Sequence, residues 1–342
     1  MSDVLSNDAV TVRLHGHDNV VIATRRIAPG TRLAGEGVVA REIIPSGHKI
    51  ATQSIPCGSA VRKYGQVIGV ATADIAAGAH VHVQNLAVSE LREEAARAAP
   101  WHRDEKPRRF LGYARADGRV GTRNYVGILT SVTCSATVAR HLAEAAERSG
   151  LLRDFPHVDG IVPITHTSGC GMAGSGEGFE ILKRTLWGTA ANANFGAILL
   201  VGLGCEVLQI DRLKKDYGLA DGAAFQSYTI QDVGGTRRAI AEGLERLKMI
   251  LPQVDAARRT PQPASALILG LQCGGSDAWS GVTSNPALGD ASDRLAALGG
   301  TVILSETPEI YGAEHLLYAR AKAPDVSAAL RARLDWWEHY TR

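Results

Sequence analysis

This chain is organised around four apolar segments that end near a cysteine: VGILTSVTC (126–134), PITHTSGCG (163–171), AILLVGLGCE (197–206) and ALILGLQCGGSD (266–277). Each segment stops at small residues, a pattern typical of a buried parallel strand whose carboxyl end opens into a loop. Ligands bind at this edge of open α/β sheets. We expect the four strands to share one sheet, so that one crevice gathers four thiols, those of Cys134, Cys170, Cys205 and Cys273.

Segments with helical periodicity alternate with these strands. Residues 135–150 (SATVARHLAEAAERSG) place apolar residues at helical spacing, and Gly150 is a predicted C-terminal cap. The alternation of strand and helix continues towards the end of the chain and predicts a mostly parallel sheet with helices on both faces. We therefore expect an α/β main domain over residues 113–342.

The beginning of the chain follows a different pattern. Short β-like segments between residues 10 and 88 are separated by turns that contain Pro and Gly, which predicts a small all-β domain at residues 1–92. SELREEAARAA (89–99) is a candidate helix, and the charged, Pro-bounded stretch after it predicts a linker over residues 93–112.

The composition excludes several classes of function. The chain has 342 residues, 45% of them hydrophobic, and a net charge of +2, and its basic residues are interleaved with acids rather than gathered for nucleic acid. The longest apolar run (197–203) is too short to cross a bilayer and we find no export signal, so we expect a cytoplasmic protein. Five cysteines, an odd number, favour thiols or metal ligands over a disulfide framework.

Histidines and lysines in the N-terminal domain are candidates for chemistry. His80 and His82 are two residues apart, so on a strand they share a face and could bind one metal ion or carboxylate; exposed strand histidines are the alternative. His48 and Lys49 follow a Pro-Ser-Gly turn, and Lys63 lies at a strand end.

Two further stretches offer groups that could bind a sugar acid. In DGRVGTRN (117–124), an arginine between glycines is well placed to bind a carboxylate, although a solvated surface turn fits these residues equally. In CGGSDAWSGVTSNP (273–286), the backbone N–H groups of residues 274–276 could hold an anion, and four side chains offer hydrogen bonds to a polyol: Asp277, Ser280, Thr283 and Asn285.

The last connection, SETPEIYGAEHLL (305–317), is rich in acidic residues. Glu309 and Glu314 could act as acid, base or metal ligand, or they could stabilise the start of a helix electrostatically.

The residues around the cysteines leave two kinds of metal site open. Thiolates favour iron, an iron–sulfur cluster or zinc, whereas His166 and the carboxylates of Glu206 and Asp277 suit Fe(II) or Mn(II). A single buried cysteine is more often a small core residue. The cysteines form no CxxC pair, so the fold must assemble any site.

Several long motifs together carry a family resemblance. GHKIA (47–51), VRKYGQVIG (61–69) and HVHVQNL (80–86) resemble the N-terminal β-clip domain, or SAF domain, of the altronate/galactarate dehydratase family. The main domain of the same family is similar in five motifs: DGRVGTRN, HTSGCG, GLGCE, QCGGSDAWSGVTSNP and SETPEIYGAEHLL. The resemblance covers nearly the whole chain, and members of the family usually continue into a further C-terminal domain.

This resemblance implies a metal-dependent lyase that removes water from a sugar acid and gives a 2-keto-3-deoxy product, with Fe(II) or Mn(II) as activator. We expect D-altronate as the substrate. Galactarate dehydratase, a sulfolactate sulfo-lyase-like enzyme, and an inactive or partner-dependent sugar-acid binding fragment are the alternatives. The expected partners are the small-molecule substrate and either a second copy of this chain or a chain that supplies the missing C-terminal part, with no nucleic acid and no membrane.

The resemblance also suggests residue roles. The expected catalytic residues are His48, Lys49, Lys63, His80, His82 and Glu309. The expected substrate-binding residues are Arg123, Asn124, Ser276, Asp277, Ser280 and Asn285. A mononuclear Fe(II) or Mn(II) site and an iron–sulfur cluster are rival hypotheses for the metal, with ligands drawn from His80, His82, Cys134, His166, Cys170, Cys205 and Cys273.

Overall fold

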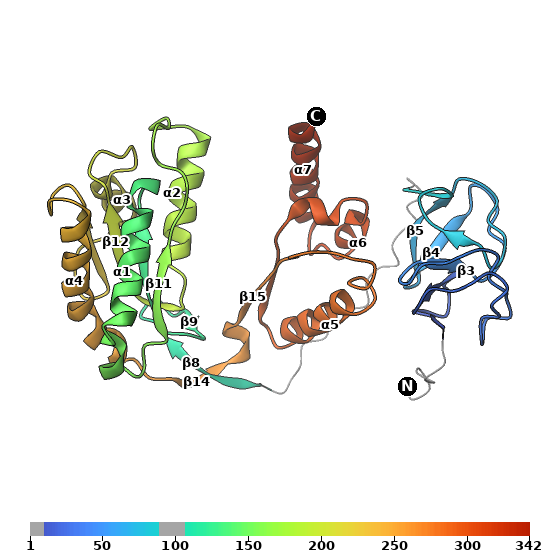
Figure 1. Ribbon diagram of the computed structural model, residues 1–342, viewed down its shortest axis with the longest axis horizontal. Coiled ribbons are helices and arrows are strands. Elements are labelled where there is room, and N and C mark those ends of the chain that lie inside the picture. The colour runs from blue at the N-terminus through green and yellow to red at the C-terminus, as the bar shows by residue number, and fades with distance from the viewer. Residues whose placement is uncertain (1–9, 89–106) are drawn as a thin grey trace. The chain divides into compact units, whose positions relative to one another are not determined.

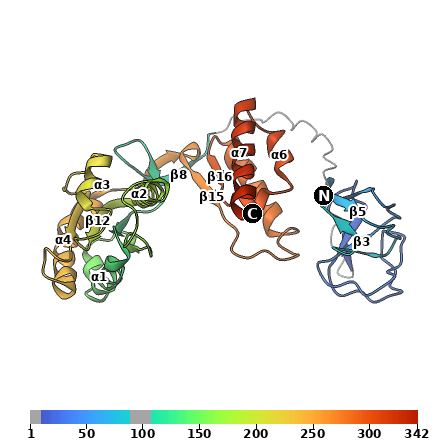
Figure 2. The same cartoon turned by 90° about the horizontal axis from the view of Figure 1, so that it is seen from above.

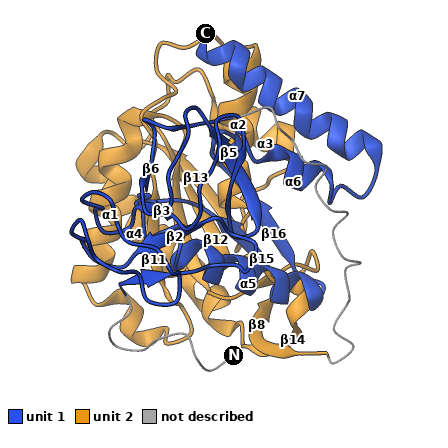
Figure 3. Cartoon of the chain, turned by 90° about the vertical axis from the view of Figure 1, so that its right-hand side faces the viewer, with its two compact units in different colours: residues 1–104, 268–342 blue, residues 105–267 orange. Residues whose placement is uncertain are grey.

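The computed structural model describes residues 10–88 and 107–342, which belong to two compact units (Figures 1 and 3). The N/C unit combines residues 1–104 with residues 268–342, and the central unit consists of residues 105–267. The single main domain expected over residues 113–342 is therefore divided after residue 267. The candidate helix at 89–99 lies outside the described residues, as does most of the expected linker, whose end belongs to strand β8.

The N-terminal part of the N/C unit is all-β, as predicted. One antiparallel sheet has the strand order β1-β2-β3-β6, and a second has the order β4-β5-β7. The strands are β1 (Thr11–Val12), β2 (Val20–Ala23), β3 (Lys49–Ala51), β4 (Ala60–Lys63), β5 (Gln66–Ala71), β6 (His80–Val81) and β7 (Leu86–Ala87). Val20 and Val21 are consecutive on β2 and pack into two different apolar clusters, because neighbouring side chains of a strand point to opposite faces.

The C-terminal part of the N/C unit contains the parallel strand pair β15 and β16 with helices around it. Its elements are β15 (Ile268–Leu271), α5 (Ser284–Ala297), β16 (Thr301–Leu304), η4 (Thr307–Ile310), α6 (Glu314–Tyr318) and α7 (Pro324–Thr341). Helix α5 begins at Ser284, so Asn285 lies in its first turn.

The central unit has a parallel sheet with the strand order β11-β10-β12-β13. Helices α1 and α4 cover one face of this sheet and α2 and α3 cover the other (Figure 2). The bounds are β10 (Tyr125–Thr130), η1 (Thr133–Ser135), α1 (Ala136–Arg148), η2 (Leu151–Asp154), β11 (Gly160–Ile164), α2 (Glu177–Ala190), β12 (Phe195–Gly202), α3 (Ile210–Tyr217), β13 (Phe225–Thr229) and α4 (Thr236–Ala256). This arrangement confirms the predicted parallel sheet with helices on both faces.

Burial on both faces explains why the strands of this sheet are continuous apolar runs. On β12, Leu199 and Val201 pack against α1 and α4, whereas Ile198 and Leu200 pack against α2 and α3. The chain leaves α1 through Gly150, whose φ of 70° is the left-handed conformation that glycine adopts without strain.

A small antiparallel sheet explains why the fourth cysteine-bearing strand is not part of the parallel sheet. It has the order β14-β8-β9, with strands β8 (Arg109–Ala114), β9 (Val120–Gly121) and β14 (Thr260–Pro263), followed by the short helix η3 (Ala264–Ala266). Because β14 pairs with β8, the chain leaves the parallel sheet before β15 begins. The expectation that four cysteines follow strands of one sheet is therefore wrong for Cys273. Across residues 10–88 and 107–342, every helix is too short or too polar to span a bilayer.

Candidate active site

A cavity of about 380 Å³ in the N/C unit brings together most of the predicted catalytic and binding residues. Its lining consists of Ile22, Gly47, His48, Lys49, Lys63, His82, Ser276, Asp277, Ala278, Gly281 and Asn285. The basic side chains come from the all-β part, and a hydroxyl, a carboxylate and an amide come from the segment that leads into α5. Concave sites with a few convergent polar groups are typical ligand sites, and this set suits an acid that carries hydroxyl groups.

Two direct contacts hold the cavity walls together. The Tyr64 hydroxyl donates a hydrogen bond to the carbonyl oxygen of Val282 at 3.1 Å. Gly47, at a φ of +80°, packs so closely that a Cβ atom there would lie 2.7 Å from the Cβ of Ala278. Any side chain at position 47 would therefore push the 276–281 loop away from His48.

We expect Gly47→Ala to weaken binding of a hydroxy acid in this cavity by about tenfold, the equivalent of about 1.4 kcal/mol, while leaving the rest of the fold in place. Gly58→Ala is the matched control, because Gly58 has the same φ of +80° and has no heavy atom within 4 Å of the added Cβ. Titration calorimetry on both variants separates loss of the contact from backbone strain. Equal affinities for the two variants would show that the Gly47–Ala278 contact does not shape the cavity.

Three histidines meet beside the cavity. Nδ1 of His48 and Nε2 of His80 are 2.9 Å apart, and the ring of His82 stacks on that of His48 with a centroid distance of 4.9 Å. The amide of Asn85 supports this group by donating to the His80 carbonyl oxygen at 2.8 Å and accepting from the His82 N–H at 3.0 Å. The two-residue spacing of His80 and His82 thus correctly predicted that their side chains lie together. His48 joins them because β3, which it precedes, pairs with β6.

Burial lowers the pKa of four basic groups at this site. It lowers the pKa of His48 and His80, and nearby basic groups lower both further. The pKa of Lys49 is lowered by burial and by the charge of Lys63, and burial lowers the pKa of Lys63 against the opposing effect of Asp18. Neutral imidazoles can bind metal ions, and a lysine with a lowered pKa can accept a proton.

The histidine cluster offers a metal ion a partial set of ligands. Nδ1 of His48 and Nε2 of His80 share a hydrogen bond at 2.9 Å, so an ion bound by both nitrogens would replace the proton between them. Within the described stretches of the chain, no three His, Cys, Asp or Glu side chains are arranged to hold a single metal ion. A cation bound to these histidines would therefore take its remaining ligands from substrate and water.

The 277–280 turn fixes the wall opposite the histidines. Oδ1 of Asp277 accepts hydrogen bonds from the N–H groups of Trp279 and Ser280, both at 2.8 Å, and these bonds hold the pKa of Asp277 below its ordinary value. Ser280 does not line the cavity, and its hydroxyl instead accepts from the Asp277 N–H at 3.1 Å. Ser276, Asp277 and Asn285 thus face the cavity, while Ser280 shapes the turn.

The predicted acid at Glu309 is not part of this cavity. Glu309 is exposed on η4 and is absent from the cavity lining. Glu306, which sequence reasoning placed only in a general acidic cluster, instead accepts the Cys273 N–H at 2.8 Å and thus ties the end of β15 to the end of β16.

The DGRVGTRN segment belongs to the central unit and is used for structure. Asn124 is fully buried; its side-chain amide donates to the carbonyl oxygens of His157 and Val254, both at 2.9 Å, and accepts from Arg115 at 3.1 Å. Arg123 is exposed, 3.9 Å from Asp159. Asn124 has no hydrogen-bonding group left for a substrate, contrary to the role expected for it.

We expect Asn124→Ala to destabilise the central unit by about 2–3 kcal/mol, because it leaves buried backbone carbonyls without donors. Arg123→Ala, at the adjacent exposed position, should change stability by less than about 0.5 kcal/mol. Urea unfolding of both variants measures the difference. Similar stability of the two variants would contradict the structural role of Asn124.

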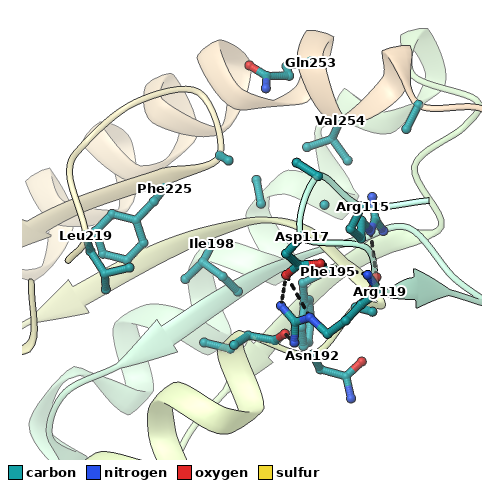
Figure 4. Close-up of a pocket in the computed structure, with 18 of the residues that line it drawn as sticks. Arg115, Asp117, Arg119, Asn192, Phe195, Ile198, Leu219, Phe225, Gln253 and Val254 are labelled. Carbon is teal, nitrogen blue, oxygen red and sulfur yellow. Dashed lines mark hydrogen bonds and ion pairs between the residues drawn. The ribbon is translucent and has the colours of Figure 1, made fainter. Parts of the chain in front are cut away.

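A second cavity, of about 500 Å³, lies in the central unit but is a weaker candidate (Figure 4). Arg115 and Arg119 line one side of it, and Ile198, Leu219 and Phe225 line another. The arginines are engaged: Nε of Arg115 donates to the Ala193 carbonyl oxygen at 2.8 Å, and Nε of Arg119 donates to Asp117 at 2.8 Å. The cavity also lies at the amino-terminal ends of the strands, opposite the edge where α/β sheets bind ligands.

Three of the predicted cysteine ligands do meet at the carboxyl edge of the parallel sheet. Cys134, Cys170 and Cys205 are exposed and follow β10, β11 and β12, respectively. The pKa of the Cys134 thiol is raised by desolvation and then by the neighbouring thiols of Cys170 and Cys205. Cys273 belongs to the N/C unit, after β15.

Both ring nitrogens of His166 form hydrogen bonds with backbone groups, so neither is free to bind a metal ion. Its Nε2 lies 3.1 Å from the Thr130 carbonyl oxygen, and its Nδ1 accepts the Ser168 N–H at 3.2 Å. Burial lowers its pKa, which favours the neutral tautomer that these two bonds require. His166 therefore fixes the loop that carries Cys170.

Comparison with known proteins identifies the three parts of the chain. Residues 9–89 match the altronate/galactarate dehydratase SAF domain, residues 112–255 match the second domain of D-galactarate dehydratase/altronate hydrolase, and residues 264–342 match the C-terminal region of D-galactarate/altronate dehydratase. The boundary between the last two agrees with the division of the structure near residue 268.

Curated relatives agree with these matches. Altronate dehydratase of Bacillus subtilis (strain 168) is 35% identical over an alignment of 325 positions that covers 92% of this chain and 63% of the relative. For altronate dehydratase of Escherichia coli (strain K12), the identity is 36% over 313 aligned positions, which cover 90% of this chain and 62% of the relative. For galactarate dehydratase (L-threo-forming) of Escherichia coli (strain K12), the identity is 35% over 352 aligned positions, gaps included, which cover 97% of this chain and 66% of the relative.

The chain thus spans less than two thirds of the length of these relatives. The three matches nevertheless follow one another along the chain and cover nearly all of it: first the SAF domain, then the second domain, then the C-terminal region. The chain belongs to the altronate/galactarate dehydratase family.

Proposed function

We propose that the cavity of the N/C unit binds a sugar acid and that the protein is a metal-dependent hydro-lyase which converts D-altronate to a 2-keto-3-deoxy sugar acid. The observation that carries this proposal is the lining of the cavity, where His48, Lys49 and Lys63 face Ser276 and Asp277. The names of two relatives at 35–36% identity favour altronate. Galactarate is the second candidate, because a galactarate dehydratase is 35% identical over 97% of this chain.

The reaction removes the hydrogen from C2 and the hydroxyl from C3 of the acid, and these leave together as water. The resulting enol takes a proton at C3 and becomes the 2-keto-3-deoxy product. The difficult step is removal of the C2 proton, because negative charge develops beside a carboxylate that already carries one. Fixed positive charge around that carboxylate is the physical requirement for the site.

The step needs a positive charge beside the carboxylate and a base for the C2 proton, and the two lysines of the cavity suit these two tasks. Lys49 lies next to His48 in the cavity wall, where its ammonium group would bind the substrate carboxylate. Lys63 has a pKa lowered by burial, and its Nζ lies 3.4 Å from the position of a Cβ on Gly281, so it reaches the opposite wall. We assign Lys63 as the base that takes the C2 proton, and Ser276, Asp277 and Asn285 as partners of the substrate hydroxyl groups.

His48 and His80, whose ring nitrogens lie 2.9 Å apart, would hold the Fe(II) or Mn(II) ion, with substrate and water as its other ligands. Bound there, the ion would supply Lewis-acid stabilisation of the charge that develops on the substrate carboxylate. The chain itself contributes the fixed orientation of the three rings, through the Asn85 hydrogen bonds and the stacking of His82 on His48.

Titration calorimetry with D-altronate and galactarate, with Mn(II) present, tests the binding site directly. We expect saturable binding of D-altronate that is weakened at least about tenfold in Lys49→Met, since a charge-assisted hydrogen bond is lost. Arg123→Ala, outside the cavity, should bind as the unmodified chain does. Absence of binding by the unmodified chain, or equal binding by Lys49→Met, would contradict the assignment of this cavity.

A further inference from the structure

The carboxyl edge of the central sheet carries three thiols that the proposed function does not use. Cys134, Cys170 and Cys205 follow three strands that are neighbours in the order β11-β10-β12. All three thiols are exposed. Cys170 and Cys205 both lie close enough to Cys134 to raise the pKa of its thiol. Parallel strands deliver their following loops to one edge, so this meeting is a direct product of the fold.

The loops of Cys134 and Cys170 are fastened to each other by backbone contacts. The Thr133 N–H donates to the Ser168 carbonyl oxygen at 2.9 Å. A Cβ on Gly169, at a φ of +93°, would lie 2.9 Å from the Ser131 carbonyl oxygen, so the two loops touch where only glycine fits. The thiols themselves take no part in these contacts.

The loop of Cys205 is fastened to the same segment through Glu206. The carboxylate of Glu206 is buried and accepts hydrogen bonds from the Ser131 hydroxyl at 2.6 Å, the Gly204 N–H at 2.6 Å and the Leu203 N–H at 3.2 Å. Its hydrogen-bonding capacity is thus used to hold the loop. With His166 also engaged, the three sulfur atoms are the candidate metal ligands at this edge.

Two helices begin close to these thiols. Helix α1 begins at Ala136, two residues after Cys134, and its first turn contains no acidic residue. Helix α3 begins at Ile210, soon after Cys205, and its first turn contains Asp211. The positive end of the α1 dipole favours a thiolate at Cys134, whereas desolvation and the neighbouring thiols raise its pKa, so a bound cation is needed to stabilise several thiolates here.

We propose that Cys134, Cys170 and Cys205 ligate a [4Fe–4S] cluster, with the fourth iron open to an exogenous oxygen ligand. All-thiolate donors select Fe–S clusters, Zn(II) or Cu(I). The described residues offer no three-donor arrangement for a single ion. A [4Fe–4S] cluster makes a different demand, since each of its irons binds one cysteine thiolate. Each thiol loses its proton as its iron–sulfur bond forms. This inference goes beyond the proposed function and does not depend on Lys63 or the histidines.

The test is anaerobic reconstitution of the reduced full chain with sulfide and equal amounts of Fe(II) and Fe(III), the iron oxidation states of a [4Fe–4S]2+ cluster, followed by measurement of iron, acid-labile sulfide and visible absorption. We expect about four irons and four sulfides per chain with a brown chromophore. Separate substitutions Cys134→Ser, Cys170→Ser and Cys205→Ser should each reduce sulfide at least about fivefold while the melting temperature is unchanged. Cys57→Ser and Cys273→Ser are the matched controls and should keep the full amount.

Three outcomes would overturn the proposal. They are uptake of iron or zinc by the unmodified chain without sulfide, full sulfide content in Cys134→Ser, and loss of the cluster in Cys273→Ser. The readout is independent of turnover, so a chain that forms the cluster but does not dehydrate sugar acids would contradict the proposed function alone.

Discussion

Replacing both His80 and His82 with alanine is expected to lower turnover of D-altronate on the order of 10³-fold. The site loses His80, one of the two proposed ligands of the Lewis acid, and the His82 ring that stacks on the other ligand, His48. Both side chains are only partly buried and lie outside the apolar clusters of the all-β part, so the fold should remain. Bound Mn(II), measured after dialysis, should fall together with turnover.

His15 and His17 provide the matched control for this double substitution. They are also two residues apart and in the same all-β part, their rings are 5.1 Å apart, and they do not line the cavity. Replacing both with alanine should leave turnover and bound Mn(II) unchanged. Retention of normal turnover after loss of His80 and His82 would remove these residues from the mechanism.

Lys63→Met is expected to lower kcat by about 10²- to 10⁴-fold, the usual contribution of a general base. Methionine keeps the length of the buried chain without its charge, so the free energy of unfolding should be unchanged or higher. Loss of activity without loss of stability is the behaviour expected of a residue placed for function. Lys248→Met is the control, since Lys248 is exposed on α4.

The lowered pKa of Lys63 also predicts a pH dependence with a definite sign. The folded chain releases this proton at a lower pH than the unfolded chain, so between the two pKa values the unfolded chain binds more protons and the free energy of unfolding rises with pH. Turnover should rise with pH as Lys63 becomes neutral. Lys63→Met should weaken both trends; a variant whose kcat and pH profile match those of the unmodified chain would exclude Lys63 as the base.

The strands and helices of the central unit were predictable because the apolar pattern of each segment matches the burial of that segment in the structure. Continuous apolar runs predicted β10 and β12, which are buried on both faces, and Gly150 marked the end of α1. The sheet of β15 was not predictable in the same way. The pairing of β14 with β8 joins segments far apart in the sequence, and it separates Cys273 from the other cysteines.

The site was predictable in its residues but not in its assembly. The spacing of His80 and His82 indicated a shared face, whereas the contact of Gly47 with Ala278 joins distant segments and left no local signal. Asn124 shows the opposite error. A polar residue in a polar motif suggested substrate binding, yet the structure buries it against backbone carbonyls that sequence pattern does not reveal.

Formation of a 2-keto acid from D-altronate is the most direct test of the account. The purified chain would be kept anaerobic, supplied with Fe(II) or Mn(II), and assayed beside the variant in which His80 and His82 are both replaced with alanine. We expect the unmodified chain to form one 2-keto-3-deoxy acid for each D-altronate consumed, and we expect the variant to form almost no product. No product from D-altronate or galactarate with either metal, or equal product from the variant, would contradict the account.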